Sequence, residues 1–463
     1  MDTAALETPS PARAGLTAAG LARVAAEERD AFVAAHPRSR ALAVRGAAHW
    51  LFGVPLHWMS DWSTPFALHV AAAVGAHVTD VDGHERVDFC LGDTGAMFGH
   101  APPAVVRAVQ RQVARGSTAM LAGEDAVAVG EALAQRFGLP LWQAAMTASD
   151  ANRFLLRWIR AATGRRTLLV FDGCYHGTVD DVFVDLVGGR PQARASLLGQ
   201  VHDLTRFTRV VAFNDLPALR AALAEGDVAC VLAEPVMTNI GMVLPDPGFW
   251  ESAQALIRAA GAMLVFDETH TFSSGPGGYA RAHGLRPDAL VLGKPIAGGV
   301  PCAAYGFSAE LAARAVQAKR DAPPGHSGIG TTLAANLLAL AAMRATLEEV
   351  ATDAAFAQMI ARAGELADGL RAAIARHRLP WCVTQVGVRC EFQFGPVPPR
   401  NGRAAAALFD APLEALIHLA LLNRGVMITP FHNMLLTCPA TTAADVQALL
   451  AAFDAVLQRL AGG

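Results

Sequence analysis

Four short polar segments carry the residues of this chain that could do chemistry. They supply a carboxylate at Asp267, a primary amine at Lys294, an aromatic ring at Tyr175 and a hydroxyl at Ser149. Each residue has a structural explanation when taken singly, because an aspartate after a strand usually caps a helix and a lysine beside glycines usually lies in a solvated loop. The combination of the four is therefore more informative than any one of them.

Together these groups meet the requirements of pyridoxal 5'-phosphate. The aldehyde of this cofactor needs a lysine amine for a Schiff base, which Lys294 can supply. The pyridine nitrogen needs a carboxylate, for which Asp267 is the candidate, and the ring face needs a platform such as Tyr175. The phosphate needs backbone N–H groups and hydroxyls at a helix start, which Thr147–Asn152 offers.

Short apolar runs precede these segments and indicate the elements that must position them. Each run is too short for a helix, and between about residues 86 and 340 the runs alternate with helical patterns. This alternation predicts an α/β fold with a mostly parallel sheet covered on both faces, and in such sheets ligands bind beyond the carboxyl ends of the strands. The runs are Gln143–Met146, Thr167–Phe171, Arg209–Phe213, Ala229–Ala233, Ala262–Phe266 and Ala289–Leu292.

Three zones are expected along the chain. Residues 1–85 form an N-terminal segment that joins the small domain and contains a hairpin turn at Asp82-Gly83. Residues 86–340 form the large cofactor-binding domain, and residues 341–463 form a smaller α+β domain. In the last zone, long helices over Leu347–His377 and Thr442–Leu460 are expected to flank strands within Trp381–Phe394 and Val426–Thr429.

Composition argues against several classes of protein. The net charge of −3 gives no electrostatic case for nucleic acid. The chain contains no run of 18 apolar residues that would predict a membrane helix. The N-terminus lacks the pattern of a signal peptide. Seven scattered cysteines, without a CxxC pair or zinc spacing, predict reduced thiols in a cytoplasmic protein that binds no metal. A nucleotide-binding oxidoreductase is excluded because no GxGxxG follows the first strand.

Two of the segments resemble those of class-III PLP-dependent aminotransferases. Phe266–Thr269 is similar to the segment with the cofactor aspartate, and Leu292–Pro301 is similar to the segment with the Schiff-base lysine. The resemblance covers most of the chain, is closest to the glutamate-1-semialdehyde aminomutase-like branch, and implies PLP fold type I. Further matches are Asp80–His84, Gly99-His100, Gly164–Arg166, Tyr175–Gly177, Glu234-Pro235, Pro245–Gly248 and His326–Gly328.

The resemblance also implies a role for each matching residue. Lys294 forms the Schiff base and shuttles the proton, Asp267 pairs with the pyridine nitrogen, and Tyr175 stacks on the ring. Thr332 matches the threonine that reaches the phosphate from the partner subunit, which implies a homodimer with a shared active site. The other expected cofactor-binding residues are Thr147, Ala148, Ser149, His176, Glu234 and Thr269.

The chain departs from the family pattern on both sides of the cofactor. Thr269 stands where an aliphatic residue usually packs under the ring, and we interpret the following His270 as a strand cap rather than a contact of the cofactor's 3'-oxygen region. The arginines that usually bind a substrate carboxylate are missing. Arg389, on a candidate strand, is a candidate anchor, with a solvated strand residue or an interface residue as the equal alternative. The substrate pocket is expected to be aromatic and lined by His57, Trp58, Met59 and Phe431.

These observations predict a ping-pong aminotransferase that moves an amino group between an amine or amino acid and an oxo-acid or aldehyde. Because the expected pocket is short of fixed cations, bulky amines or amino compounds with a distant carboxylate should be preferred over small α-amino acids. A 1,2-aminomutase or racemase remains an alternative, since it would use the same cofactor residues. A PLP-fold protein without turnover is disfavoured because Lys294, Asp267 and Tyr175 are all present.

Overall fold

The computed structural model describes residues 10–461 and divides into two compact units. The first unit comprises the described residues up to Pro102, Ala354–Pro398 and the described residues from Ala407. The second unit comprises Pro103–Asp353 and Pro399–Ala406. The borders at 102 and 353 compare with expected borders near 85 and 340. Residues 1–9 of the expected N-terminal segment lie outside the described residues.

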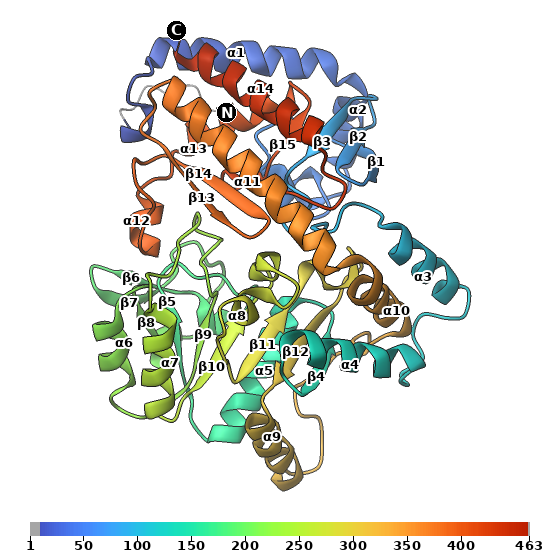
Figure 1. The fold of residues 1–463 in the computed structure, drawn as a ribbon, viewed down its shortest axis with the longest axis vertical. Coiled ribbons are helices and arrows are strands. Elements are labelled where there is room, and N and C mark those ends of the chain that lie inside the picture. The colour runs from blue at the N-terminus through green and yellow to red at the C-terminus, as the bar shows by residue number, and fades with distance from the viewer. Residues whose placement is uncertain (1–9, 462–463) are drawn as a thin grey trace. The chain divides into compact units, whose positions relative to one another are not determined.

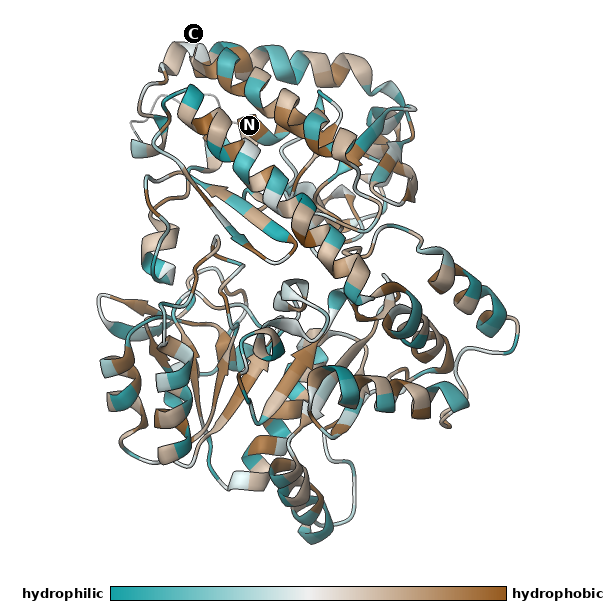
Figure 2. Ribbon diagram, viewed as in Figure 1, coloured by the Kyte–Doolittle hydropathy of each residue, from teal (hydrophilic) through white to brown (hydrophobic). Residues whose placement is uncertain are grey.

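A seven-stranded sheet forms the centre of the second unit (Figure 1). Strand β12 is antiparallel to both of its neighbours, and the remaining pairs are parallel, which confirms the expected mostly parallel sheet. The inner strands are buried along their whole length and mostly apolar (Figure 2), because both faces of the sheet are covered. In sheet order the strands are β4 (Leu141–Ala145), β12 (Ala303–Phe307), β11 (Ala289–Leu292), β10 (Met263–Asp267), β9 (Val228–Ala233), β5 (Thr167–Phe171) and β8 (Thr208–Val211).

Helices of the second unit begin and end at recognisable signals. Helix α5 (Ala148–Thr163) is capped by the Thr147 side chain, which accepts from the Asp150 N–H, and it ends at Gly164 in the left-handed conformation. It packs against β12 and α9. The other elements are α3 (Pro103–Val113), α4 (Glu124–Phe137), β6 (Val184–Val187), β7 (Arg190–Ala193), α6 (Leu216–Leu223), α7 (Phe249–Ala259), α8 (Gly278–Ala282), α9 (Ala309–Asp321), α10 (Leu337–Ala345) and α12 (Gly402–Ala406).

The first unit has its own sheets and its own apolar core. A four-stranded sheet contains the hairpin expected at Asp82-Gly83, between β2 and β3, and a three-stranded antiparallel sheet lies within the same unit. The core is formed largely by the helices of this unit and the three-stranded sheet. The elements are α1 (Ala18–Ala35), α2 (Pro37–Gly46), β1 (Val70–Val74), β2 (His77–Asp80), β3 (Glu85–Asp88), α11 (Asp353–Arg376), β13 (Cys382–Val386), β14 (Arg389–Gln393), α13 (Ala411–Leu422), β15 (Val426–Met427), β16 (Met434–Leu436) and α14 (Ala443–Ala461).

Two expectations about elements are wrong or incomplete. The helix expected over Leu347–His377 does not exist as one element, because a π-helical turn over Thr346–Val350 ends at Ala351 and α11 begins at Asp353. Strand β12 was not expected, although it pairs with β4 and β11 inside the sheet. No helix among residues 10–461 is long and apolar enough to cross a membrane.

Candidate active site

The candidate active site lies at the carboxyl ends of neighbouring parallel strands in the second unit. Asp267 is the last residue of β10 and pairs in register with Val291 of β11, and Lys294 follows the end of that strand by two residues. Lys294 adopts a φ of +40°, in the left-handed region that non-glycine residues rarely occupy. Such backbone strain is concentrated at functional sites, where the surrounding structure enforces it.

The Asp267 carboxylate is buried and accepts four hydrogen bonds. Its Oδ1 accepts from the Thr269 backbone N–H at 3.1 Å and from the Thr269 hydroxyl at 2.6 Å. Its Oδ2 accepts from Asn152 Nδ2 at 2.8 Å and contacts His176 Nδ1 at 3.1 Å. These donors come from the end of β10, from α5 and from the turn after β5. Three separate segments of the chain therefore orient this one carboxylate.

Charge pairing stabilises the ionised form of Asp267. Burial alone would raise the pKa of Asp267, but the hydrogen bond and charge of His176, with help from Thr269 and Asn152, lower it. Burial alone would lower the pKa of His176, but its contacts with Cys174 and Asp267 raise it to about 10. The site thus holds a deep carboxylate in its charged form, which suits it to pair with a protonated ring nitrogen.

The amine of Lys294 contacts a histidine. Its Nζ lies 2.5 Å from Nε2 of His270, whose Nδ1 lies 2.9 Å from the Thr238 hydroxyl. The Thr238 hydroxyl donates in turn to Oε2 of Glu234 at 3.0 Å. His270 is therefore more than the strand cap that we expected, because it contacts the candidate Schiff-base lysine directly.

The start of α5 is packed closely against the turn that carries Tyr175. The Ser149 hydroxyl accepts from the Thr178 N–H at 3.0 Å, and a Cβ added at Gly177 would lie 2.1 Å from that hydroxyl oxygen. A Cβ added at Gly293 would lie 2.7 Å from Cβ of Ala148. The strand ends that carry Asp267, Lys294 and Tyr175 thus meet the N-terminus of one long helix, where first-turn N–H groups and the helix dipole favour an anion.

Tyr175 is positioned by its backbone. Its N–H donates to Glu234 Oε1 at 3.0 Å, while its side chain is exposed. Glu234 itself is buried and also accepts from Thr238 and Asn239, so it orders the loop after β9 as well as the turn after β5. Thr332 is exposed in the second unit, in the segment before α10.

The expected substrate residues all lie in the first unit. The ring of Trp58 meets that of Phe431 edge-on at a centroid distance of 6.0 Å, and both rings are exposed, as are His57 and Met59. Arg389 lies on β14 and is 0% exposed. Its guanidinium contacts Thr94 Oγ1 and Met434 Sδ, each at 2.7 Å. This burial is inconsistent with the solvated alternative and does not favour a role as a substrate anchor.

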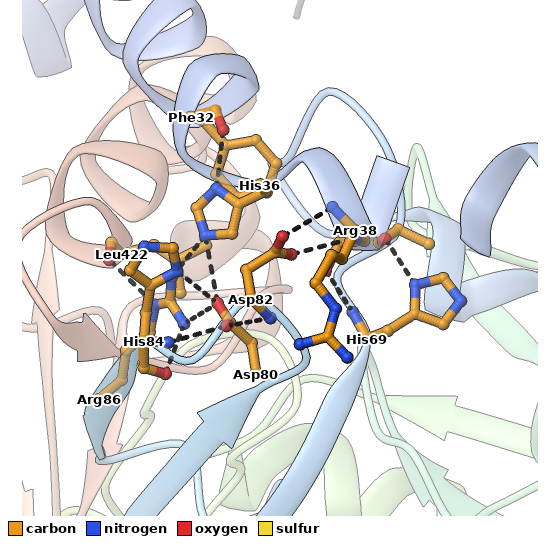
Figure 3. Close-up of polar contacts among 11 residues, drawn as sticks. Phe32, His36, Arg38, His69, Asp80, Asp82, His84, Arg86 and Leu422 are labelled. Atoms are coloured by element: carbon orange, nitrogen blue, oxygen red, sulfur yellow. Dashed lines mark hydrogen bonds and ion pairs between the residues drawn. The ribbon is translucent and has the colours of Figure 1, made fainter. Parts of the chain in front are cut away.

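A second polar cluster, formed by His36, Asp80 and His84, belongs to the first unit (Figure 3). Its potential ligand atoms lie within 4.8 Å of one another. The guanidinium of Arg86 already lies between them, 2.7 Å from Asp80 Oδ2 and 2.7 Å from His36 Nε2. Burial lowers the pKa of His36, whose other nitrogen donates to the Phe32 carbonyl at 2.7 Å. In this cluster the positive charge of Arg86 balances the negative charge of Asp80. The contacts of His36 therefore link the end of α1 to the β2–β3 hairpin.

The chain contains two lysines, and this count strengthens the assignment of the amine. Lys319 is exposed on α9, whereas Lys294 is half-buried beside the other candidate groups. Thr238 and the bond from Asn152 to Asp267 were not expected from the sequence. Thr238 lies in an irregular loop without a pattern that could reveal it, whereas Asn152 is on the inner face of the helix that begins at the predicted phosphate loop.

Comparisons with known proteins extend over most of this chain. A family model described as aminotransferase class-III matches residues 58–457. Over 369 residues the chain is 33% identical to a glutamate-1-semialdehyde 2,1-aminomutase from Anaeromyxobacter dehalogenans, with 78% of this chain and 83% of that protein covered.

Solved structures give the same result. A glutamate-1-semialdehyde-aminomutase from Pseudomonas aeruginosa is 49% identical, with a TM-score of 0.94, and the match covers 96% of this chain and 100% of that one. A lysine-to-alanine variant of that protein was solved in complex with PMP. An omega-transaminase from Sphaerobacter thermophilus is 28% identical, with a TM-score of 0.84 and coverage of 93% of this chain and 100% of that one.

Proposed function

This chain belongs to the class-III aminotransferase family, and on that premise we propose that it relocates amino groups on pyridoxal 5'-phosphate held by Lys294. The observation that carries the proposal is the pair of adjacent strand ends with Asp267 on one and Lys294 on the next. When bound, the cofactor supplies an aldehyde that captures amines and an aromatic ring that accepts electrons from the adjacent carbon.

Residues of this chain fit each part of that cofactor. Lys294 Nζ would attach to the aldehyde, and the charged Asp267 carboxylate would hold the ring nitrogen protonated. Tyr175 would cover one face of the ring. The first-turn N–H groups of α5 and the Ser149 hydroxyl would bind the phosphate, as helix N-termini commonly do. The tight approach of Gly177 to Ser149 keeps that hydroxyl in place.

Lys294 would then act as the base and acid at the substrate carbon. Its amine takes a proton from the carbon that bears the amino group and returns a proton to a neighbouring atom, which is the minimal step for moving an amino group. Asp267 stabilises the charge that develops in this step and need not move, since its bonds to Asn152 and His176 fix its position.

We propose the 1,2-aminomutase reaction as the first candidate outcome. It is supported by the likeness to glutamate-1-semialdehyde aminomutases over nearly the full chain. In this reaction the amino group leaves one carbon and returns to its neighbour, so a single molecule is both donor and acceptor and no free oxo-acid is released.

Transfer between two molecules is the second candidate outcome. The observation that favours it is the exposed aromatic pair Trp58 and Phe431, which suits an apolar amine better than a small charged amino acid. The guanidinium of Arg389 is 0% exposed, so Arg389 is not supported as the cationic anchor that a small amino acid would need. We further propose a homodimer in which Thr332 of each chain completes the site of the other, and a cytoplasmic location.

Reduction with borohydride tests the attachment site. After reduction and digestion, mass spectrometry should find the cofactor on the peptide that contains Lys294. A Lys294→Ala variant should lose this adduct completely, whereas a Lys319→Ala variant should keep it, since Lys319 is an exposed residue of α9. Cofactor attached to Lys319 in the wild-type protein would contradict the proposal.

A pair of assays separates the two outcomes. The holoenzyme is given glutamate-1-semialdehyde alone, and separately an aryl-alkyl amine with pyruvate. The aminomutase isomerises the first compound without releasing an oxo-acid, whereas the aminotransferase converts the amine to a ketone and pyruvate to alanine. If neither substrate set reacts although cofactor is bound to Lys294, both candidate outcomes are wrong.

A further inference from the structure

Four side chains of the second unit form a continuous line that ends at the candidate Schiff-base lysine. Glu234 Oε2 accepts from the Thr238 hydroxyl at 3.0 Å, this hydroxyl lies 2.9 Å from Nδ1 of His270, and Nε2 of His270 lies 2.5 Å from Lys294 Nζ. Glu234, Thr238 and His270 are all buried. The line therefore runs from a buried carboxylate to the half-buried amine.

The sheet explains why these residues meet. Glu234 directly follows β9, His270 lies three residues beyond β10, and Lys294 lies two residues beyond β11. The three strands are consecutive neighbours and parallel, so their carboxyl ends emerge side by side. Thr238 reaches the line from the loop that Glu234 itself holds through the Thr238 N–H at 3.0 Å.

The polarity of the line follows from its ends. Glu234 Oε2 already accepts from two nitrogen donors, the Thr238 backbone N–H and Asn239 Nδ2, each at 3.0 Å. Glu234 Oε2 is thus an acceptor, so the Thr238 hydroxyl must donate its hydrogen bond to this oxygen. That hydroxyl can then only accept from His270, so Nδ1 of His270 carries a proton. Nε2 is left with a lone pair that faces Lys294.

We propose that His270, in the tautomer fixed by Glu234 through Thr238, is the positioning residue and proton acceptor of Lys294. An N–H bond of the Lys294 ammonium breaks and an N–H bond forms at His270 Nε2, so the positive charge moves to the imidazole and the amine gains its lone pair. Only the free amine can attack an aldehyde or remove a proton from carbon. This role rests on the proposed function, because it specifies how Lys294 becomes reactive.

The Glu234 carboxylate lowers the free-energy cost of this transfer. The imidazolium that results would lie next to the Thr238–Glu234 pair, whose carboxylate stabilises it. Two other carboxylates precede His270 in the chain, and each has its own hydrogen-bond donors. Asp267 is bound by His176 and Asn152, and Glu268 accepts from the backbone N–H groups of Tyr279 and Ala280.

Competitive labelling of the full-length apoprotein tests the proposal without any turnover. Acetic anhydride is applied at a series of pH values, and mass spectrometry gives the labelling of Lys294 relative to Lys319, which is the other lysine of the chain and serves as an internal reference. In His270→Gln, the ratio near neutral pH should fall about fivefold or more, because the amide keeps an acceptor but cannot take a proton. In Thr238→Val, the ratio should also fall, since the tautomer is no longer fixed.

Cofactor loading provides the second readout. Covalent uptake of pyridoxal 5'-phosphate, followed by absorbance, should slow about tenfold in His270→Gln near neutral pH and recover as the pH is raised. The matched control is His283→Gln, whose ring stacks on Tyr279 at 3.9 Å in the same unit, and it should behave as wild type. Melting temperatures of all variants are compared before either readout is interpreted.

Two results would overturn the proposal. The first is His270→Gln with a wild-type labelling ratio and loading profile, which would reduce His270 to a packing residue that Gln replaces. The second is Thr238→Val with a wild-type profile, which decides the matter even if His270→Gln does not fold, because it leaves the imidazole in place. Failure of the proposed function is distinguishable, since wild-type protein would then not attach the cofactor to Lys294 at all.

Discussion

At the scale of single residues, Asp267 shows how much structure is needed to keep one buried carboxylate charged. A carboxylate moved out of water is strongly destabilised unless donors and a positive partner replace the lost hydration. Here the partner is His176, and Thr269 and Asn152 supply the other donors. The pKa of Asp267 is therefore lowered despite the burial that would raise it.

Asp267→Asn should lower turnover by at least about a hundredfold while the protein still binds the cofactor. The amide removes the negative charge that holds a ring nitrogen protonated, so the loss falls on the transition state rather than on binding. Steady-state kinetics and the cofactor dissociation constant measure the two effects separately. Asp288→Asn is the matched control, because Asp288 is also in the second unit and accepts from the Leu264 N–H at 2.8 Å. Near-normal turnover of Asp267→Asn would show that Asp267 is only a structural residue.

The cofactor residues predicted most directly from the sequence lie at or shortly after the ends of strands. Asp267, Lys294 and Tyr175 could be found because strand ends are visible as short apolar runs. The contact of His270 with Lys294 was missed, since a single histidine after an Asp-Glu-Thr segment has no pattern that separates a cap from a partner of lysine. Thr238 could not be predicted, because its role depends on the path of an irregular loop.

At the scale of elements, the site depends on how closely the turn after β5 approaches the first turn of α5. Gly177 has a φ of +79°, and a Cβ there would lie 2.1 Å from Ser149 Oγ and 2.9 Å from Ser149 Cα. Both the backbone conformation and the available space thus require glycine. The turn carries Tyr175 and the helix start offers the candidate phosphate site, so one contact positions both.

Gly177→Ala should weaken cofactor binding about tenfold or more, because the turn must move away from Ser149 to make room for the methyl group. Gly188→Ala is the matched control: Gly188 also has a positive φ, +60°, but nothing lies within 4 Å of its added Cβ. The control carries the same class of backbone strain without the clash. Equilibrium titration with the cofactor, together with the melting temperature, distinguishes the two variants. Equal losses in both would mean that strain alone, and not the contact with Ser149, is responsible.

Strand prediction was accurate where runs were continuous and failed where they were not distinctive. Strand β5 has the expected bounds, and β9, β10 and β11 lie within one residue of theirs. Strand β12 was missed because Ala303–Phe307 follows a Gly- and Pro-rich stretch and reads as part of a loop. The break before α11 was missed because Thr346–Val350 remains helical in character, and Ala351 ends it through its backbone conformation rather than by a proline or glycine.

At the scale of the whole molecule, the boundaries of the two units cannot be recognised from the order of segments along the sequence. The first unit is assembled from three separate stretches, and the second contains a short return segment, Pro399–Ala406. These divisions arise from contacts between residues distant in sequence, which composition and periodicity do not record. The same limit applies to the substrate residues, because Trp58 and Phe431 meet only through the fold of the first unit.

The first unit also contains a buried acid with no function in the proposed chemistry. Glu414 lies on α13, and its Oε1 accepts no hydrogen bond from the residues that the structure describes. Burial raises the pKa of Glu414 to about 8; the charge of His432 opposes this rise, and those of Glu391 and Asp410 add to it. The folded protein therefore holds a proton on Glu414 that the unfolded chain releases near an ordinary glutamate pKa of about 4.3.

This difference makes the stability of the protein depend on pH in a definite direction. Between about pH 4.3 and 8 the native state binds more protons at Glu414 than the unfolded state, so its contribution to stability falls as the pH rises. Glu414→Gln keeps the shape and removes the titration. Near pH 9 this variant should raise the melting temperature by several degrees, which corresponds to about 1–3 kcal/mol in the free energy of unfolding. Near pH 5 it should change the melting temperature little.

Glu365→Gln, on the exposed face of α11, is the matched control and should leave the pH dependence unchanged. Thermal unfolding across this pH range measures the effect, and a Glu414→Gln curve parallel to that of the wild type would mean that Glu414 is already ionised in the folded protein.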